Sequence, residues 1–247
     1  HAETGSSLAR IVPPLFNELA NRLTPVQLQK NLLMEAVQDP GQQLRMSRLL
    51  QAVDGAQNLL RPLMMVLSPS SPRLEPSSVN LLVQEAAKRV EAEAAASGVT
   101  MDFMLDPGVP ECGLDPDMVR DALANLFRSG IFASVKSTVK RVRVGTRLVG
   151  NLLQIVSQDT GPAIPEPEKG RVFELAGASD IESLGLCALA TVAQAHGGRV
   201  SVRSQAGVGN AFLLELPMSD AAPKPASSPS LQGKRILVLD DEAFLLE

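Results

Sequence analysis

Hydrophobic residues in the first 67 positions recur at helical spacing in two stretches, residues 8–33 and residues 46–66. Their steps of three, four or seven residues are typical of amphipathic helices. Between the two stretches, QDPGQQ at 38–43 contains proline and glycine and predicts a turn, and SPSSP at 68–72 ends the second helix. Residues 1–72 are therefore expected to form an α-helical hairpin.

An isolated hairpin of this kind leaves an apolar stripe on each helix uncovered. A homodimer would bury both stripes in a four-helix bundle, and docking on a neighbouring domain is the alternative. Because the stripe runs the length of both helices, we favour the dimer.

The first helix also carries a polar stripe in the segment NELANRLTP. At ~100° per residue, Asn17, Asn21 and Thr24 fall along one line, with Glu18 beside the first of them. Such a stripe is either a reaction centre or the solvent-exposed side of the helix, and the pattern alone favours the second interpretation. Pro25 lacks a backbone N–H and predicts a bend.

Residues 77–217 change in character, because helical and strand patterns now alternate. The predicted helices are 83–96, 115–133 and 184–195, and the predicted strands are 99–105, 140–149, 152–157, 199–204 and 211–217. Residues 165–183 have little periodicity and predict a long loop. Helices that cover one face of a mixed sheet define an α+β two-layer sandwich.

The chain ends in a different composition. Residues 218–233 include SDAAPKPASSPSLQG and have the composition of a linker. KRILVLDDE, from residue 234, predicts a buried strand followed by acids. Residues 234–247 are too few to form a domain.

Composition narrows the classes of function. A chain of 247 residues with 45% hydrophobic residues suffices for two domains, and a net charge of −4 without a basic run argues against nucleic acid as a partner. Cys112 and Cys187 are expected to be reduced, and His196 is expected to pack or cap a helix. No secretory signal and no apolar run of ~18 residues is present. We therefore expect a cytoplasmic protein without a membrane segment in this chain.

Taken in order, these segments resemble the core of a hybrid sensor histidine kinase. NELANRLTP aligns with the family's phosphoacceptor motif, which in part of the family reads His-Glu-x-x-Asn-x-x-Thr-Pro. The other similar segments are DPDMVRDALANLFRSG (the N-box), VSQDTGPAIP (the G1 box), SLGL with AHGGRVSVRSQAGVGNAFLLELP (the G2 region and closing strands) and KRILVLDDE (the start of a receiver domain). The resemblance implies a dimeric hairpin, an ATPase-like domain, ATP with Mg²⁺ as cofactors, and a response regulator or receiver domain as partner.

The phosphoacceptor position departs from the family, because Asn17 stands where the family has its histidine. A carboxamide nitrogen delocalises its lone pair and does not attack the γ-phosphorus of ATP as imidazole does. The resemblance implies that Glu18 would act as a base and that Asn21 would position water to dephosphorylate a partner. The alternative is that both are solvated helix residues.

The nucleotide boxes depart as well. By resemblance Asn125 keeps the first N-box asparagine, whereas Ser129 replaces the second and Phe132 replaces a lysine. A serine hydroxyl reaches less far than a carboxamide and should hold Mg²⁺ weakly. Asp159 keeps the acceptor for the adenine amino group, and Gly161 keeps one G1 glycine.

The glycine-rich G2 run, which offers N–H groups to phosphate in the family, is also reduced. Gly185 and Leu186 remain of it, with Ile181 and Ser183 at glycine positions, and Ala163 replaces a G1 glycine. ATP and Mg²⁺ binding is therefore expected to be weak or absent.

The preferred interpretation is a degenerate histidine kinase, a pseudokinase that signals by dimerisation and docking without autophosphorylation. The alternative is a sensor kinase that still binds ATP, with kinase or response-regulator phosphatase activity. A histidine phosphotransfer protein is disfavoured, because residues 2–70 contain no histidine.

Overall fold

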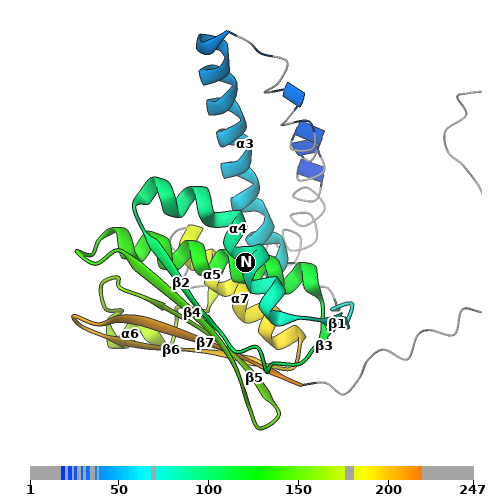
Figure 1. The fold of residues 1–247 in the computed structure, drawn as a ribbon, viewed down its shortest axis with the longest axis vertical. Helices are drawn as coiled ribbons and strands as arrows, with labels where there is room; N and C mark the ends of the chain where they lie inside the picture. Colours follow the sequence, from blue (N-terminus) through cyan, green and yellow to red (C-terminus); the bar gives the residue numbers. More distant parts are fainter. Residues whose placement is uncertain are drawn as a thin grey trace, which may run out of the picture.

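The computed structural model describes residues 39–67, 71–175 and 181–218, with isolated positions between residues 18 and 37. Most of the first predicted helix lies outside the described residues, as do the linker from residue 219 and the whole of 234–247. The rest forms a two-layer α+β domain from which one long helix extends (Figure 1). The predicted α+β sandwich is confirmed.

The sheet has five strands and mixed direction. In spatial order they are β2 (Thr100–Leu105), β4 (Arg141–Val149), β5 (Leu152–Asp159), β7 (Gly209–Pro217) and β6 (Arg199–Gln205). β2 runs parallel to β4, and the other neighbours are antiparallel. All five predicted strands are present. β5 continues two residues past the predicted end at 157, which places Asp159 opposite Asn210 of β7.

Three helices contact the strands of the sheet: α4 (Val79–Ser97), α5 (Pro116–Val135) and α7 (Ile181–Ala195). Their apolar sides and the inward residues of the strands form one core, which includes Val83, Phe127 and Ile155 at 0% exposure. α4 begins four residues before the predicted start at 83, because Ser78 caps it by accepting a bond from the Leu81 N–H. α5 is capped by Asp115, which accepts from the Met118 N–H at 3.0 Å.

The sequence analysis did not predict the shortest helices and strands. β1 (Glu75–Ser77) and β3 (Cys112–Leu114) pair as a small antiparallel sheet. α6 (Glu166–Lys169) and the first residues of α7 lie inside the predicted loop 165–183. The prediction of a loop without secondary structure was therefore wrong at both ends of that segment.

The long helix α3 (Pro40–Leu67) begins inside the predicted turn at 38–43. Asp39 accepts a 2.8 Å hydrogen bond from the Gln42 N–H and so caps the helix, and Pro40 occupies the first helical position, which tolerates proline. The turn prediction was wrong because Pro40 and Gly41 are the first residues of this helix.

The carboxyl-terminal part of α3 packs on α7 of the α+β domain (Figure 1). Leu60 is 5% exposed and Met65 packs on the core, while Leu44 and Leu49 near the other end are each 55% exposed. Docking on a neighbouring domain, the alternative for the hairpin's apolar stripe, therefore occurs for this half of α3. The homodimer stays a prediction.

Within the described residues, none of the helices combines the length and the apolar character needed to cross a membrane.

Candidate functional site

A cavity of ≈ 590 Å³ opens between α5, the end of β5, the loop that follows it and the start of α7. It brings together three of the predicted site residues, Ser129, Asp159 and Leu186. Lys136 and Asn210, which the sequence analysis did not single out, also line it. The cavity therefore joins the segments that resemble the N-box, the G1 box and the G2 region.

Asp159 lies in the cavity wall and is 1% exposed. Its Oδ1 accepts hydrogen bonds from the Gly161 N–H and from Nδ2 of Asn210, each at 2.8 Å. Burial raises the pKa of the Asp159 carboxyl, and these hydrogen bonds oppose the rise by favouring the carboxylate. The backbone N–H of Asn210 also contributes a hydrogen bond to this carboxyl, so Gly161 and Asn210 together hold it in the cavity wall.

Gly161 is held in close contact with the end of α5. A Cβ at this position would lie 2.6 Å from Cβ of Ala133 and 2.9 Å from its carbonyl carbon. Gly209 is equally constrained, because its φ is +119° and a Cβ would lie 1.9 Å from the carbonyl oxygen of Asp159. Glycine at these two positions lets the backbone close around Asp159.

Asn210 links Asp159 to the neighbouring strands and is 3% exposed. Its Nδ2 also donates to the Pro162 carbonyl at 3.1 Å, and its Oδ1 accepts from the Ser204 hydroxyl at 2.7 Å. That hydroxyl in turn accepts from the Ile164 N–H at 2.8 Å. The signal that could have identified Asn210 is its place on the inward side of an otherwise apolar strand.

The N-box substitutions change the mouth of the cavity. Ser129 is 9% exposed, and Phe132, at the lysine position of the family, is 46% exposed. The ammonium of Lys136 lies 4.6 Å from the centre of the Phe132 ring, one helical turn further along the chain. A cation is therefore present at the cavity, on a different residue from the one the family pattern predicts.

Asn125 and Gly185 do not line this cavity. A Cβ on Gly185 would lie 3.2 Å from Cβ of Asn125, so these two residues form part of the packing of α7 on α5. Oδ1 of Asn125 accepts from the Arg128 guanidinium at 3.2 Å, and Arg128 is itself paired with Glu93. The structure thus separates two predicted cofactor-binding residues from the three at the cavity.

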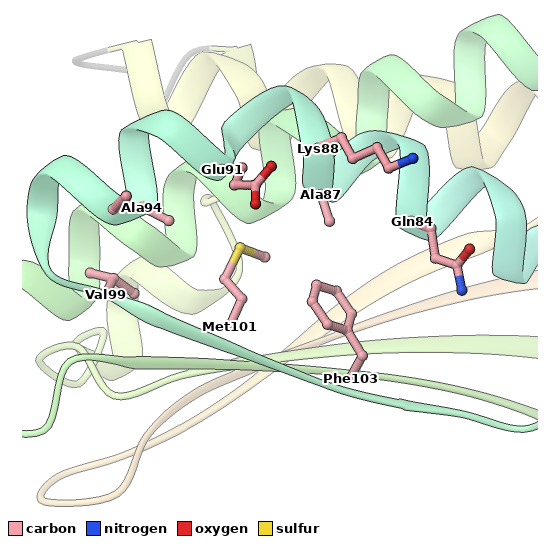
Figure 2. A pocket seen from close by; sticks show the side chains of 9 residues that line it. Gln84, Ala87, Lys88, Glu91, Ala94, Val99, Met101 and Phe103 are labelled. Carbon is pink, nitrogen blue, oxygen red and sulfur yellow. The ribbon is translucent and has the colours of Figure 1, made fainter.

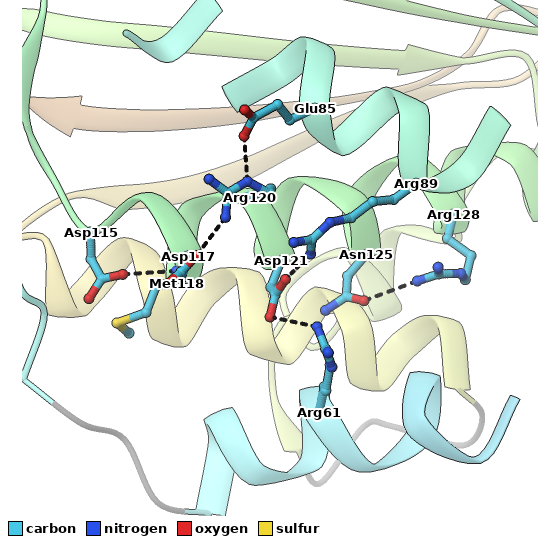
Figure 3. A network of polar contacts seen from close by, with 10 residues as sticks. All are labelled: Arg61, Glu85, Arg89, Asp115, Asp117, Met118, Arg120, Asp121, Asn125 and Arg128. Atoms are coloured by element: carbon cyan, nitrogen blue, oxygen red, sulfur yellow. Dashed lines mark hydrogen bonds and ion pairs between the residues drawn. The ribbon is translucent and has the colours of Figure 1, made fainter. Parts of the chain in front are cut away.

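Ion pairs along α5 hold the neighbouring helices to it (Figure 3). Asp121 pairs with Arg89 of α4 and, at 3.4 Å, with Arg61 of α3. Arg120 pairs with Glu85 of α4 at 2.6 Å. Asp121 therefore connects α5 with both α4 and α3.

Residues of the phosphoacceptor segment are only partly described. Glu18 is exposed and pairs with Arg22 at 2.8 Å. Asn17, Asn21 and Thr24 lie outside the described residues.

The expected capping role of His196 is confirmed. Its Nε2 accepts a 3.0 Å hydrogen bond from the Asp115 N–H, and its Nδ1 lies 2.8 Å from the Val192 carbonyl. The ring therefore links the end of α7 with the start of α5.

A second hollow, of ≈ 490 Å³, lies between α4 and the edge strand β2 (Figure 2). Met101 and Phe103 of β2 line it from one side, and alanines of α4 line it from the other together with Lys88 and Glu91. It contains none of the predicted site residues.

Comparisons with known proteins agree with this arrangement. Residues 114–220 match the family model "Histidine kinase-, DNA gyrase B-, and HSP90-like ATPase". The alginate biosynthesis sensor protein KinB of Pseudomonas aeruginosa is 29% identical over 214 residues, which are 82% of this chain and 36% of KinB. The sensor histidine kinase ZraS of Escherichia coli (strain K12) is 23% identical over 216 residues, which are 86% of this chain and 46% of ZraS.

Among solved structures, full-length ShkA in complex with AMPPNP has a similar fold. The TM-score is 0.64 at 22% identity, and the match covers 85% of this chain and 46% of ShkA. The chain spans less than half the length of KinB and of ZraS. Residues 114–220 are therefore similar to this ATPase family, and most of the chain is similar to the matched parts of sensor histidine kinases.

Proposed function

We propose that this chain is the core of a histidine kinase that signals within a two-component system without phosphorylating itself. One observation carries the proposal: Asn17 occupies the position at which the aligned motif has its phosphorylated histidine. An amide nitrogen does not supply the nucleophilic lone pair that phosphoryl transfer from ATP requires.

The adenine end of the nucleotide site fits the residues present. The residues that line the cavity fall within the part of the chain that matches the ATPase family. The carboxylate of Asp159 can accept from an adenine amino group, while Gly161 and Asn210 hold it in place. We infer that the cavity takes the adenine moiety of a nucleotide.

The residues at the metal end of the site do not fit Mg²⁺ in the way the family pattern implies. Asn125, the one N-box asparagine that remains, lies outside the cavity lining and accepts from Arg128. Ser129 offers a short hydroxyl, and the cation beside Phe132 is the ammonium of Lys136 rather than a lysine at position 132. We therefore propose that Mg²⁺ is held weakly or not at all, and no phosphoryl-transfer step is assigned to this chain.

Signalling would then depend on contacts between helices and domains. The packing of α3 on α7 and the Arg61–Asp121 ion pair support a defined contact of α3 with the α+β domain. A dimer through residues 8–66 would relay a change in that contact to a partner subunit, and a response regulator or the receiver domain that would begin near residue 234 is the proposed recipient.

The second candidate function is phosphatase action on a response regulator. The observation that favours it is the exposure of Glu18, which leaves its carboxylate within reach of a partner, although it is paired with Arg22. Asn21 would orient the attacking water in that case.

Isothermal titration with AMPPNP, ADP and adenosine, each with and without Mg²⁺, tests the proposal. We expect Mg²⁺ to change none of the three affinities by more than about threefold, because the family's metal-holding residues are not retained at the cavity. The same titrations are made with Asp159→Asn, which removes the carboxylate from the cavity wall. Glu111→Gln is the matched control, because it removes an exposed carboxylate elsewhere. Tightening of AMPPNP by Mg²⁺ of more than about tenfold would contradict the loss of the metal site.

A further inference from the structure

The open face of the sheet carries an excess of positive charge in a chain whose net charge is −4. The helices that contact the sheet lie on one of its faces, and no described helix covers the other (Figure 1). Side chains alternate along each strand, so every second residue points to this open face. The charged residues there are Arg141, Arg143, Arg147, Arg199, Arg203, Asp102 and Glu215.

A hollow of ≈ 660 Å³ lies on this face, here called the sheet trough. Arg147 of β4 forms one rim, and Arg199 and Arg203 of β6 form the other. The floor consists of Val156, Ala211 and Leu213, from the two strands between the rims.

A row of hydrogen bonds crosses all four strands at one end of the trough. Nε of Arg147 donates to Gln154 at 2.7 Å, and Nε2 of Gln154 donates to Glu215 at 2.8 Å. Nε of Arg199 completes the row by donating to the other oxygen of Glu215 at 2.6 Å. The row holds the two rims at fixed positions across the sheet.

Arg203 differs from the other two rim arginines. It is exposed, and it takes part in none of the ion pairs within the described part of the chain. A cation beside an apolar floor, in a trough with one buried acid, favours an anionic partner that also carries apolar side chains.

The dimensions identify the shape of that partner. β4 and β6 are separated by two strands, so at ~4.8 Å per strand the rims stand about 14 Å apart. An α-helix with its side chains is about 10–12 Å in diameter and fits between them. Arg199 and Arg203 are four residues apart, about 13 Å along the strand, which equals two to three turns of helix.

We propose that the sheet trough binds an acidic amphipathic helix of a partner protein. The apolar stripe of the helix would lie on Val156, Ala211 and Leu213, and its Asp or Glu side chains would face Arg203 and, on the opposite rim, the guanidinium group of Arg147. This inference is independent of the nucleotide site and of the phosphoacceptor position.

Fluorescence anisotropy tests the proposal with a labelled synthetic peptide of about 18 residues. The peptide consists of leucine, alanine and glutamate, with a leucine stripe at helical spacing and glutamates on both flanks; a permuted peptide of the same composition lacks the stripe. We expect saturable binding of the first peptide to the full chain, weakening with added salt, and none of the permuted one.

Arg203→Glu should weaken binding at least about fivefold, because it replaces attraction by repulsion. Leu213→Gln should also weaken it, whereas Arg73→Glu makes the same charge change at an exposed residue away from the sheet and should have no effect. Circular dichroism confirms that each variant is folded.

Equal binding by Arg203→Glu and Arg73→Glu, or equal binding of the two peptides, would overturn the proposal. So would capture of phosphatidylserine vesicles or of duplex DNA through Arg203 without binding of the peptide.

Discussion

The side-chain amide of Asn210 donates a 2.8 Å hydrogen bond to Oδ1 of Asp159, and the two residues are directly paired across β5 and β7. The bond helps to hold the Asp159 carboxylate in the wall of the cavity. In Asp159→Asn, the new amide oxygen would keep the bonds from Gly161 and Asn210, and its NH₂ would face the cavity. The side-chain NH₂ at position 159 would then face the amino group of adenine, and two hydrogen-bond donors cannot bond to each other. AMPPNP and adenosine should therefore each bind to this variant at least about tenfold more weakly than to the wild type.

The same variant makes a prediction about pH. Because burial raises the folded-state pKa of Asp159, its contribution to stability is fully present below the unfolded pKa and is lost as pH rises through the folded value. Asp159→Asn should therefore melt at the same or a higher temperature than the wild type at neutral pH. A marked fall in melting temperature at that pH would contradict the assignment of burial as the dominant influence.

Gly161→Ala tests the close approach between the loop after β5 and the end of α5. The added methyl group would overlap backbone and side chain of Ala133, so we expect a loss of about 1–3 kcal/mol in the free energy of unfolding. Gly170→Ala is the control, since a Cβ there meets nothing within 4 Å. Denaturant titration of both variants measures the difference, and equal stability would mean that the loop moves freely from α5.

Glu215 provides a second pH dependence with the opposite sign. The hydrogen bond from Arg199, followed by that from Gln154, lowers the pKa of the Glu215 carboxyl. The stabilising contribution of Glu215 to the folded state is fully present above the pKa of the unfolded chain, about 4.3. It is lost as the pH falls through the lower pKa of the folded state. Melting curves from pH ~6 downward should therefore decline less steeply for Glu215→Gln than for the wild type or Glu111→Gln. If the melting temperatures of all three proteins fell in parallel with pH, the hydrogen bonds of Glu215 would not contribute to stability.

Much of the fold could be predicted from the periodicity of hydrophobic residues, because the five strands and the three helices of the α+β domain are long enough to repeat their pattern. The starts of the helices were predicted less accurately. Ser78 and Asp39 cap α4 and α3 through hydrogen bonds that the pattern of apolar residues does not reveal. β1 and β3 have three residues each, too few for any period.

The candidate site was predicted as far as single motifs allow. Asp159, Ser129 and Leu186 meet at one cavity as their motifs indicate. The bond of Asn210 to Asp159 depends on strand register, and the cation of Lys136 lies one turn beyond the aligned lysine position. Neither relationship exists within one motif, so a comparison motif by motif missed both.

Both cysteines are expected to be unreactive in the folded chain. Burial raises the pKa of the Cys112 thiol to about 11 and also raises that of Cys187. At pH 8 the thiolate, which is the reactive form, is therefore scarce. Ellman's reagent should label both thiols slowly in buffer and rapidly in denaturant. Fast labelling of one thiol in buffer would contradict this. It would mean that the strand or helix that carries the cysteine unfolds locally at a low cost in free energy.

The central claim is that phosphoryl transfer is lost at both the acceptor and the metal site. Its most direct test is incubation of the wild type and Asn17→His, Ser129→Asn and doubly substituted variants with γ-labelled ATP and Mg²⁺. We predict no acid-labile, base-stable label on the wild type and little on Asn17→His, with more on the double variant than on either single one, because nucleophile and metal act on the same step. Vigorous labelling of Asn17→His alone would contradict the account and would identify an ordinary kinase with one inactivating substitution.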